Sequence, residues 1–583
     1  MLSIGISSTI KLKIILNNKY IRHSNGTTNS TNFFCDFFLM SSTQTRRALR
    51  TPSQIWHDGW FWGSLALAGI MALPVFALIW LSLGAVGDVW PHLMAHVIPT
   101  QLITTLQLML GVGIICAVTG TITAWLVTFC QFPGRRFFAW ALLLPLAMPT
   151  YLSAYSYADM LDQAGPFYGV WSALFAAEFY PRIHSIGGAI GVLSLVLYPY
   201  VFLSARAAFI QQSTTLIEAA RTLGLAPAGC FWRVGLPLAR PAVAVGVALV
   251  LMECLNDIGA VEHLGAETLT IGVYDTWLVR GSLVGAAQLA LMLLGFIALL
   301  TLVERSQRRT SSYSARQGRQ RSLPRFMLSK AGAIAAFISC LLPVLFGFIL
   351  PTFALVSDAL YQSVTFELQS AATNSFMLAA IAAALTTGLG LLLAYGAHSS
   401  RIRAMRALVG FSALGYAIPG TVLAIGIMIT LSGIDSSLSY LGNWSSGAVL
   451  SGTLVALVFA YTVRFLALAH GTLEAGFGRI SPHMDMAARS LGTTRSQTLF
   501  RVHIFLLRPP VLAALLLVFV DVMKELPATL VLRPFDFDTL ATLVYMRASL
   551  GQLEEAALPA LMIILVGLMP VVIALMLLDT QRR

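Results

Sequence analysis

Twelve long apolar stretches divide this sequence, and they restrict its fold more than any other feature. A run of about 20 mostly apolar residues is long enough for a helix to cross a bilayer. Of the 583 residues, 57% are hydrophobic and 11% are charged, whereas soluble domains carry about 25% charged residues. The sequence therefore predicts an all-α polytopic membrane protein and argues against a soluble enzyme or a disordered chain. The expected spans lie at about 60–84, 102–130, 136–161, 187–211, 241–260, 283–303, 331–356, 371–397, 405–432, 447–470, 509–531 and 557–578.

Basic residues are concentrated in alternate loops. Arginines occur in the loops around Arg135, Arg221 and Arg403, whereas residues 85–101 and 357–370 contain neither lysine nor arginine. The positive-inside rule places the basic loops, and with them both chain ends, in the cytoplasm. The formal net charge of +12 is thus interpreted as a topology signal in a chain surrounded by membrane lipid. It does not predict a nucleic-acid partner.

The chain divides into four parts. Residues 1–55 are polar apart from one short apolar run and are expected to be an N-terminal extension or cytoplasmic tail; a true start at Met40 is one interpretation, and a genuine tail is the other. Residues 56–303 and 331–583 each hold six expected spans. The segment 304–330 between them contains seven arginines and is interpreted as a basic cytoplasmic linker.

The two six-span halves repeat one another. Both copies of the Ala-Ala-Arg segment lie on the basic side, so the halves share one orientation. Parallel repeats of this kind are related by an axis along the membrane normal, and we expect a pathway at the interface between them. At offsets of 268 to 271 residues, Gly120 matches Gly390, Met148-Pro149 matches Ile418-Pro419, Ala219–Gly224 matches Ala487–Gly492, Arg240-Pro241 matches Arg508-Pro509, and Tyr274 matches Tyr545.

The loop between the fourth and fifth spans carries the signals of two short helices. It runs from Glu218-Ala-Ala-Arg-Thr-Leu-Gly224 through nine residues to Val234-Gly-Leu-Pro237. Gly224 suits the end of the first helix because glycine accepts left-handed backbone geometry. Residues 225–233 can begin a second helix, and Pro237 is expected to interrupt the chain before the next span. A rigid projection repeated in both halves suits docking to a two-fold partner.

This spacing resembles the coupling-loop signature of permeases of binding-protein-dependent ABC importers. In that family the loop docks into a groove on the ATP-binding subunit and transmits its closure to the membrane helices. The second copy departs from the signature: Met486 stands in place of the glutamate, with Asp485 beside it, and Phe505 stands in place of Pro237. The resemblance implies coupling contacts at Glu218, Ala219, Ala220, Gly224, Ala487, Ala488 and Gly492.

Further segments resemble the fused ferric-iron permeases of this family, and the resemblance covers about residues 55–580. These segments are Met252–Glu262, Thr268–Trp277, Lys524–Thr529, Leu532–Phe535 and Glu555–Pro559. The resemblance implies a bacterial inner membrane protein that receives Fe(III) from a periplasmic binding protein and works with two copies of an ATP-binding subunit. ATP and magnesium are then bound by that subunit, and this chain binds no cofactor. Permeases for thiamine, phosphonates and polyamines share the coupling loop, so these substrates remain alternatives.

Four carboxylates within the expected spans are candidates for the substrate route, because charges inside a membrane are costly and mark functional sites. Glu253 and Asp257 are spaced i, i+4 and are predicted to share one face of the fifth span. Asp521 and Glu525 repeat them 268 residues later. Hard oxygen ligands suit a trivalent cation. In the alternative interpretation these side chains lie near the outer mouth and pair with Lys524 or with other structural partners.

Histidines and tyrosines on the expected outer side form no firm metal site. His92 and His96 are also spaced i, i+4, but no third ligand is near them in the sequence. We interpret them as residues that lie at the membrane interface. The same interpretation applies to Tyr151, Tyr155 and Tyr157, which follow Pro149.

The sequence contains no G-x-x-x-x-G-K-[ST] loop, which predicts that the chain neither binds nor hydrolyses ATP and is not an enzyme. An ion-coupled secondary transporter is the alternative of another class, because such proteins also often have twelve spans in two parallel halves. It would not need a repeated helical projection on the cytoplasmic side.

Overall fold

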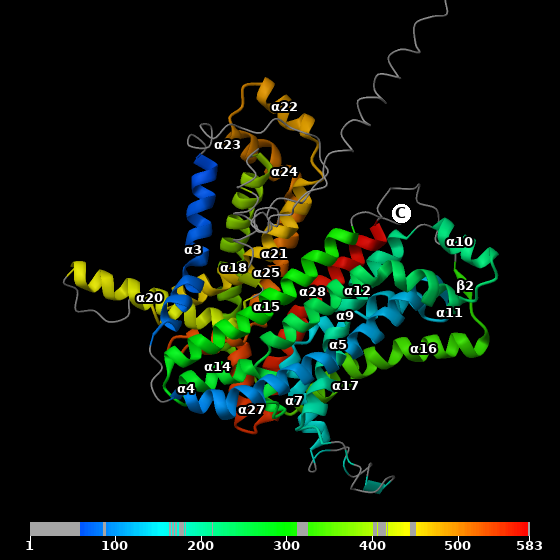
Figure 1. Cartoon of the computed structure of the whole chain (residues 1–583), viewed down its shortest axis with the longest axis horizontal. Helices are drawn as coiled ribbons and strands as arrows, with labels where there is room; N and C mark the ends of the chain where they lie inside the picture. The colour runs from blue at the N-terminus through cyan, green and yellow to red at the C-terminus, as the bar shows by residue number, and fades with distance from the viewer. Residues whose placement is uncertain are drawn as a thin grey trace, which may run out of the picture. The chain divides into compact units, whose positions relative to one another are not determined.

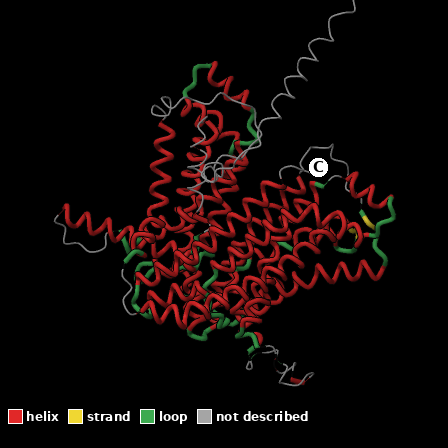
Figure 2. Tube along the Cα trace, viewed as in Figure 1, coloured by secondary structure: helices red, strands yellow, loops and turns green. Residues whose placement is uncertain are grey.

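The computed structural model describes residues 59–84, 89–162, 182–212, 214–311, 325–399, 418–442 and 450–580, together with a few isolated residues between these ranges. Within them the chain is almost wholly helical (Figures 1 and 2). The expected tail at 1–55 lies outside the described residues, as does 312–324 of the basic linker. The predicted all-α polytopic class is confirmed.

Ten described helices are long and apolar enough to cross a membrane, and two bent helix pairs bring the number to twelve if each pair is one span. In the first half the helices are α3 (Gly59–Ser82), α4 (Val89–His92), α5 (Ile98–Phe129), α6 (Arg135–Ala141), α7 (Thr150–Leu161), α9 (Ile186–Gln211), α10 (Thr214–Thr222), α11 (Pro227–Cys230), α12 (Leu236–Asn256), α13 (Gly259–His263), α14 (Leu269–Leu278) and α15 (Leu283–Ser311). Short π or 3₁₀ segments are η2 (Leu93–Val97), η3 (Leu144–Ala147) and η5 (Phe231–Gly235).

The described part of the second half has a similar order of elements. Its helices are α16 (Lys330–Val344), α17 (Leu350–Ala359), α18 (Phe366–Ser399), α20 (Gly420–Gly442), α21 (Leu454–Phe477), α22 (Pro482–Ser490), α23 (Arg495–Thr498), α24 (Ile504–Leu506), α25 (Arg508–Met523), α26 (Pro527–Leu532), α27 (Leu540–Ser549) and α28 (Leu553–Thr580), with π segments η7 (Leu345–Ile349) and η9 (Leu499–His503). α10 and α22 have matching bounds at an offset of 268 residues, and α14 and α27 match at 271. The sequence repeat is therefore a repeat of structure.

The first helix of each half lies against the other half. α3 packs along α20, and α16 contacts α5 and α6. A short parallel pairing of β1 (Cys130–Gln131) with β2 (Phe326–Met327) joins the end of α5 to the segment before α16. The halves are intertwined by these contacts, and residues 49–583 form one compact unit.

Two matched glycines let long helices approach closely. A Cβ on Gly120 of α5 would lie 2.8 Å from the backbone nitrogen of Phe202 in α9. A Cβ on Gly390 of α18 would lie 3.2 Å from the backbone nitrogen of His470 in α21. Because backbone atoms cannot rotate away, Gly120 could not be replaced without a shift of the two helices, and the contact at Gly390 is tight.

Prolines set the bends, although not where the loop signature predicted one. The third span bends by 89° between η3 and α7, where Pro149 precedes the first turn of α7. Pro237 was expected to interrupt the chain, and this is wrong: residues Pro227–Asn256 run as one helix. The π segment η5 and the position of Pro237 in the first turn of α12 accommodate the missing N–H.

The sharp break occurs instead in the second half. There the chain bends by 78° at Leu507, immediately before Arg508-Pro509-Pro510. Two consecutive prolines remove two backbone donors and so end the preceding helix. The matching site of the first half has the single Pro241, and α12 continues through it.

Two expected spans end earlier than predicted. The fifth span was placed at 241–260, but α12 ends at Asn256; the eleventh was placed at 509–531, but α25 ends at Met523. In both cases an acidic residue, Asp257 or Glu525, lies between the end of the span and a new short helix. The outer loop expected at 433–446 is helical as far as Gly442, where α20 ends.

Candidate functional site

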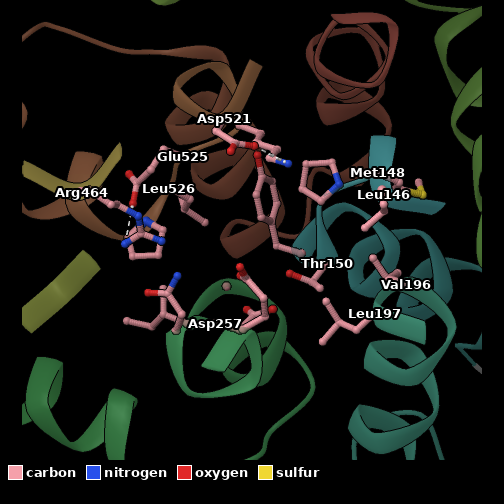
Figure 3. Close-up of a pocket in the computed structure, with 18 of the residues that line it drawn as sticks. Leu146, Met148, Thr150, Val196, Leu197, Asp257, Arg464, Asp521, Glu525 and Leu526 are labelled. Atoms are coloured by element: carbon pink, nitrogen blue, oxygen red, sulfur yellow. Dashed lines mark ion pairs between the residues drawn. The ribbon is translucent and has the colours of Figure 1, made fainter. Parts of the chain in front are cut away.

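A cavity of about 130 Å³ lies where the two halves meet. Figure 3 shows its labelled side chains: Asp257 approaches from the first half, and Asp521 and Glu525 approach from the second. All four carboxylates predicted from the sequence line this cavity. Its polar lining residues are Thr150, Tyr151, Tyr200, Glu253, Asn256, Asp257, Tyr416, Arg464, Asp521, Lys524 and Glu525.

The carboxylates do not converge in the way the i, i+4 spacing predicted. Asp257 lies beyond the end of α12 in an extended backbone conformation, and Glu525 lies beyond the end of α25. Neither therefore shares a helix face with the acidic residue four positions before it. The cavity is instead formed because each span ends there and a short helix, α13 or α26, starts beside it.

Asp257 and Glu525 each accept hydrogen bonds from the start of the short helix that follows. The backbone N–H of Ala260 donates to Asp257 Oδ1 at 2.9 Å. The backbone N–H groups of Ala528 and Thr529 donate to Glu525 at 3.2 Å each, and the Thr529 hydroxyl donates at 2.9 Å. A carboxylate at a helix N-terminus satisfies free N–H groups and favours the helix dipole. These two acids therefore hold α13 and α26 in place.

Two cations pair with acids of the second half. Arg464 of α21 lies 3.4 Å from Glu525 Oε1, and both side chains are almost fully buried. Lys524 lies 2.8 Å from Asp521 Oδ1. Arg464 and Lys524 carried no role in the substrate-route hypothesis, although the pairing alternative named Lys524. The acids thus line a common cavity and two of them are paired, while a substrate route through this cavity stays a prediction.

Contacts between the halves fix the other side of the cavity. The Tyr416 hydroxyl donates to Glu253 Oε1 at 3.2 Å, and the backbone N–H of Gly420 donates to the Asn256 side chain at 2.9 Å. A Cβ on Gly420 would lie 2.5 Å from a guanidinium nitrogen of Arg464. The start of α20 is therefore in close contact with the paired charges.

Each half also projects a helical elbow. The first elbow comprises α10, α11 and η5 (214–235), and the second comprises α22, α23 and η9 (482–503). The left-handed backbone predicted at Gly224 is present, with a φ of 80°, and the matching Gly492 has a φ of 78°. Of the residues predicted to couple, those with exposed positions are Glu218, Ala219, Gly224, Ala487 and Gly492, whereas Ala220 and Ala488 are buried.

Large apolar side chains are exposed at matching places on the two elbows, and the sequence reasoning missed them. Leu223 and Leu491, which precede the left-handed glycines, are 82% and 83% exposed. Two further matched pairs are exposed: Leu216 with Met484 and Trp232 with Phe500. The signal was available, because these residues recur at an offset of 268 in segments otherwise rich in polar residues.

The outer histidines and tyrosines do not assemble a metal centre. His92 and His96 are exposed, and their rings stack at 5.3 Å. No group of three His, Cys, Asp or Glu side chains that could hold a metal occurs in the described ranges. Tyr151 lines the cavity, Tyr155 packs edge-on against His263, and the Tyr157 hydroxyl donates to the backbone of Phe346 in η7.

The chain matches a family model and several known proteins. Residues 109–311 match the family described as binding-protein-dependent transport system inner membrane component. The Fe(3+)-transport system permease protein FbpB 2 of Haemophilus influenzae is 26% identical over 80% of this chain and 88% of its own length. A putative 2-aminoethylphosphonate transport system permease protein, PhnU, of Salmonella typhimurium is 28% identical over 39% of this chain and 84% of its own length. The sulfate transport system permease protein CysT of Synechocystis is 27% identical over 37% of this chain and 78% of its own length.

These matches span both halves, agree with the helical membrane fold and include the segment that contains the first elbow. Residues 109–311 therefore carry the binding-protein-dependent inner membrane component domain, and the chain is a permease of the ABC importer type.

Proposed function

We propose that this permease carries ferric iron across a bacterial inner membrane. In this proposal a periplasmic binding protein delivers the ion, and two copies of an ATP-binding subunit drive transport. The similarity to an Fe(3+) permease over 80% of the chain supports iron. The phosphonate and sulfate permeases resemble less than two fifths of it.

The observation that carries the proposal is the cavity between the halves, which receives two acidic residues from each half. Carboxylate oxygens suit a hard cation. One water needs about 10–15 Å³ of such a volume, so a cavity of about 130 Å³ has room for an ion with several of its waters. Transport needs contacts that form and break, and a cavity of this size favours exchange of water for carboxylate oxygen over a closed cage.

The four acids have different roles in this proposal. Glu253 and Asp521 project from helices α12 and α25 and are only partly buried, so they are the transient ligands. Asp257 and Glu525 hold α13 and α26 through backbone hydrogen bonds and thereby shape the route. Movement of the halves then alters the route through the contacts at Tyr416 and Asn256.

The elbows are the docking points for the ATP-binding subunits in this proposal. The exposed leucines next to Gly224 and Gly492 offer one apolar contact per half, and burial of a leucine contributes about 1.5–3 kcal/mol. Two matched elbows suit two copies of one subunit. ATP and magnesium belong to that subunit, and this chain binds no cofactor.

The test measures ferric-iron-stimulated ATPase activity and iron uptake by the reconstituted complex with its binding protein. Replacement of Glu253 by Gln together with Asp521 by Asn is expected to lower iron uptake at least tenfold. Glu267→Gln, which changes an exposed acid outside the cavity lining, is the matched control and is expected to transport normally. Unchanged iron uptake in the double variant would contradict the proposal that Glu253 and Asp521 are ligands on the iron route.

An oxyanion is the second candidate substrate, because Arg464 and Lys524 line the same cavity. Both cations are paired with acids, and four carboxylates against two cations leave a formal surplus of two negative charges. This surplus favours a cation. Stimulation of ATP hydrolysis by a phosphonate or sulfate, and none by ferric iron, would select the second candidate and leave the importer mechanism intact.

A further inference from the structure

The second elbow is attached to the membrane helices by a cluster of three polar side chains. Asp485 of α22 points inward, and its two carboxylate oxygens each meet an imidazole. His398 Nε2, at the end of α18, lies 3.0 Å from Asp485 Oδ2. His503 Nε2, at the end of η9, lies 2.8 Å from Asp485 Oδ1. One carboxylate therefore joins α22 to the end of α18, outside the elbow, and to η9, the last part of the elbow before the chain continues into α25.

Aromatic side chains enclose this cluster. The His503 side chain is fully buried, and Tyr395 and Phe477 each lie about 5.6 Å from it, measured between ring centroids. The His398 ring stacks on Phe477 at 5.0 Å. Hydrogen bonds to a charged group in such surroundings are stronger and more directional than exposed ones. The cluster thus fixes both the distance and the orientation of α22.

The first elbow has an apolar attachment at the equivalent positions. At an offset of 268, Ile217 takes the place of Asp485 and Gly235 takes the place of His503; at 270, Thr128 takes the place of His398. Ile217 is buried. A Cβ on Gly235 would lie 2.4 Å from the ring of Trp125, so the large indole fills the space that the His503 imidazole fills in the second half.

The polar attachment occurs in the second elbow, which is also the elbow that departs from the coupling-loop signature. Met486, at the place of the glutamate, is 56% exposed and does not anchor the second elbow. The acidic residue has moved by one position, and on a helix this turns the carboxylate from the outer face to the inner face.

We infer that His398, Asp485 and His503 are positioning residues for coupling, which transmit movement of the second elbow to α18 and α25 as the apolar contacts of Ile217 and Trp125 do in the first half. The inference rests on the proposed docking of an ATP-binding subunit at the elbows. The carboxylate contacts both imidazoles, so its loss weakens the link between α22 and the membrane helices. The outer face of the elbow, where the ATP-binding subunit is proposed to dock, stays intact. We therefore expect ATP hydrolysis to continue while transport falls.

The experiment measures ferric iron transported per ATP hydrolysed in proteoliposomes that contain the permease, its ATP-binding subunit and the binding protein. Asp485→Asn keeps the shape but replaces one of the two acceptor oxygens by an N–H donor, so one imidazole must lose its hydrogen bond or move its proton to the other ring nitrogen, and the ratio is expected to fall about tenfold. His398→Leu removes one donor and is expected to lower the ratio similarly. His398→Gln can place an amide N–H where Nε2 lies and is expected to restore most of it.

Thr128→Val, at the first-half equivalent of His398, is the matched control and is expected to leave the ratio unchanged. The ATP-binding subunit should copurify equally with every variant. A normal ratio in Asp485→Asn and His398→Leu would overturn the inference and leave the importer function standing. If Asp485→Asn does not fold, the inference is tested by comparing the transport ratio of His398→Leu with that of His398→Gln. Failure of the unaltered complex to couple transport to ATP would instead contradict the proposed function.

Discussion

At the scale of single residues, the acids of the cavity serve both the fold and the proposed route. Glu525 is almost fully buried, accepts three hydrogen bonds from α26 and faces Arg464. Removing one member of a buried pair is more costly than removing both, because the remaining charge is left without compensation. The stability of this site therefore depends on the partner of each acid as much as on the acid itself.

The pair Arg464–Glu525 gives a prediction about stability. Arg464→Met leaves Glu525 buried without its cation and is expected to cost about 3–5 kcal/mol. Adding Glu525→Gln to it should recover part of that loss, since the amide needs no counter-charge. Thermal unfolding of the three proteins in detergent checks this. A double variant less stable than Arg464→Met would contradict the account.

A second residue-scale prediction concerns His263, which follows the fifth span. Burial, together with the neighbouring His184, lowers the pKa of His263 to about 4. The unfolded state takes up its proton near pH 6.5 while the folded state stays neutral, so stability is lost as pH falls from about 6.5 towards 4. The unfolding temperature at pH 5 should drop below its value at pH 7.5. His263→Phe, which cannot be protonated, should show a smaller drop, and an equal drop in both proteins would refute the assignment.

At the scale of elements, the repeat made much of the fold predictable. Matching Gly120 with Gly390, and 219–224 with 487–492, was enough to expect two equivalent halves, and the left-handed Gly224 and Gly492 follow from helix-end chemistry. The ends of the fifth and eleventh spans were not predictable from hydropathy. Apolar residues continue past them, and the break depends on an acid that accepts backbone hydrogen bonds from the next short helix.

The candidate site was predictable in its members and not in its geometry. The repeat identified Glu253, Asp257, Asp521 and Glu525, but the face-sharing argument assumed an unbroken helix. Arg464 could not be found in this way, because the first half has no cation at the equivalent place on α9. Its pairing with Glu525 is a tertiary contact that no spacing encodes.

Close helix packing gives an element-scale prediction. Gly120→Ala puts a methyl group against the backbone of α9 and is expected to destabilise the protein by about 1–3 kcal/mol through overpacking. Gly191 in α9 has open space around its Cβ position, so Gly191→Ala is the matched control and should be neutral or stabilising by up to about 1 kcal/mol. Thermal unfolding distinguishes them, and equal effects would show that α5 and α9 can separate without cost.

At the scale of the whole molecule, the two halves exchange their first helices and meet at one acidic cavity. α3 packs on α20 and α16 packs on α5, so neither half has a complete surface of its own. Each half also carries an elbow with an exposed leucine. The two elbows are attached differently, one through apolar packing and one through Asp485. We therefore expect movement of an ATP-binding subunit to be transmitted to the membrane helices through different contacts in the two halves.

Uptake of radioactive ferric iron into proteoliposomes tests whether this permease is driven by ATP hydrolysis. The vesicles contain this permease, its ATP-binding subunit and the iron-loaded binding protein. We expect iron to accumulate only when ATP and the binding protein are both present, and a proton or sodium gradient to have no effect. Accumulation driven by an ion gradient without ATP would contradict this expectation and favour an ion-coupled transporter.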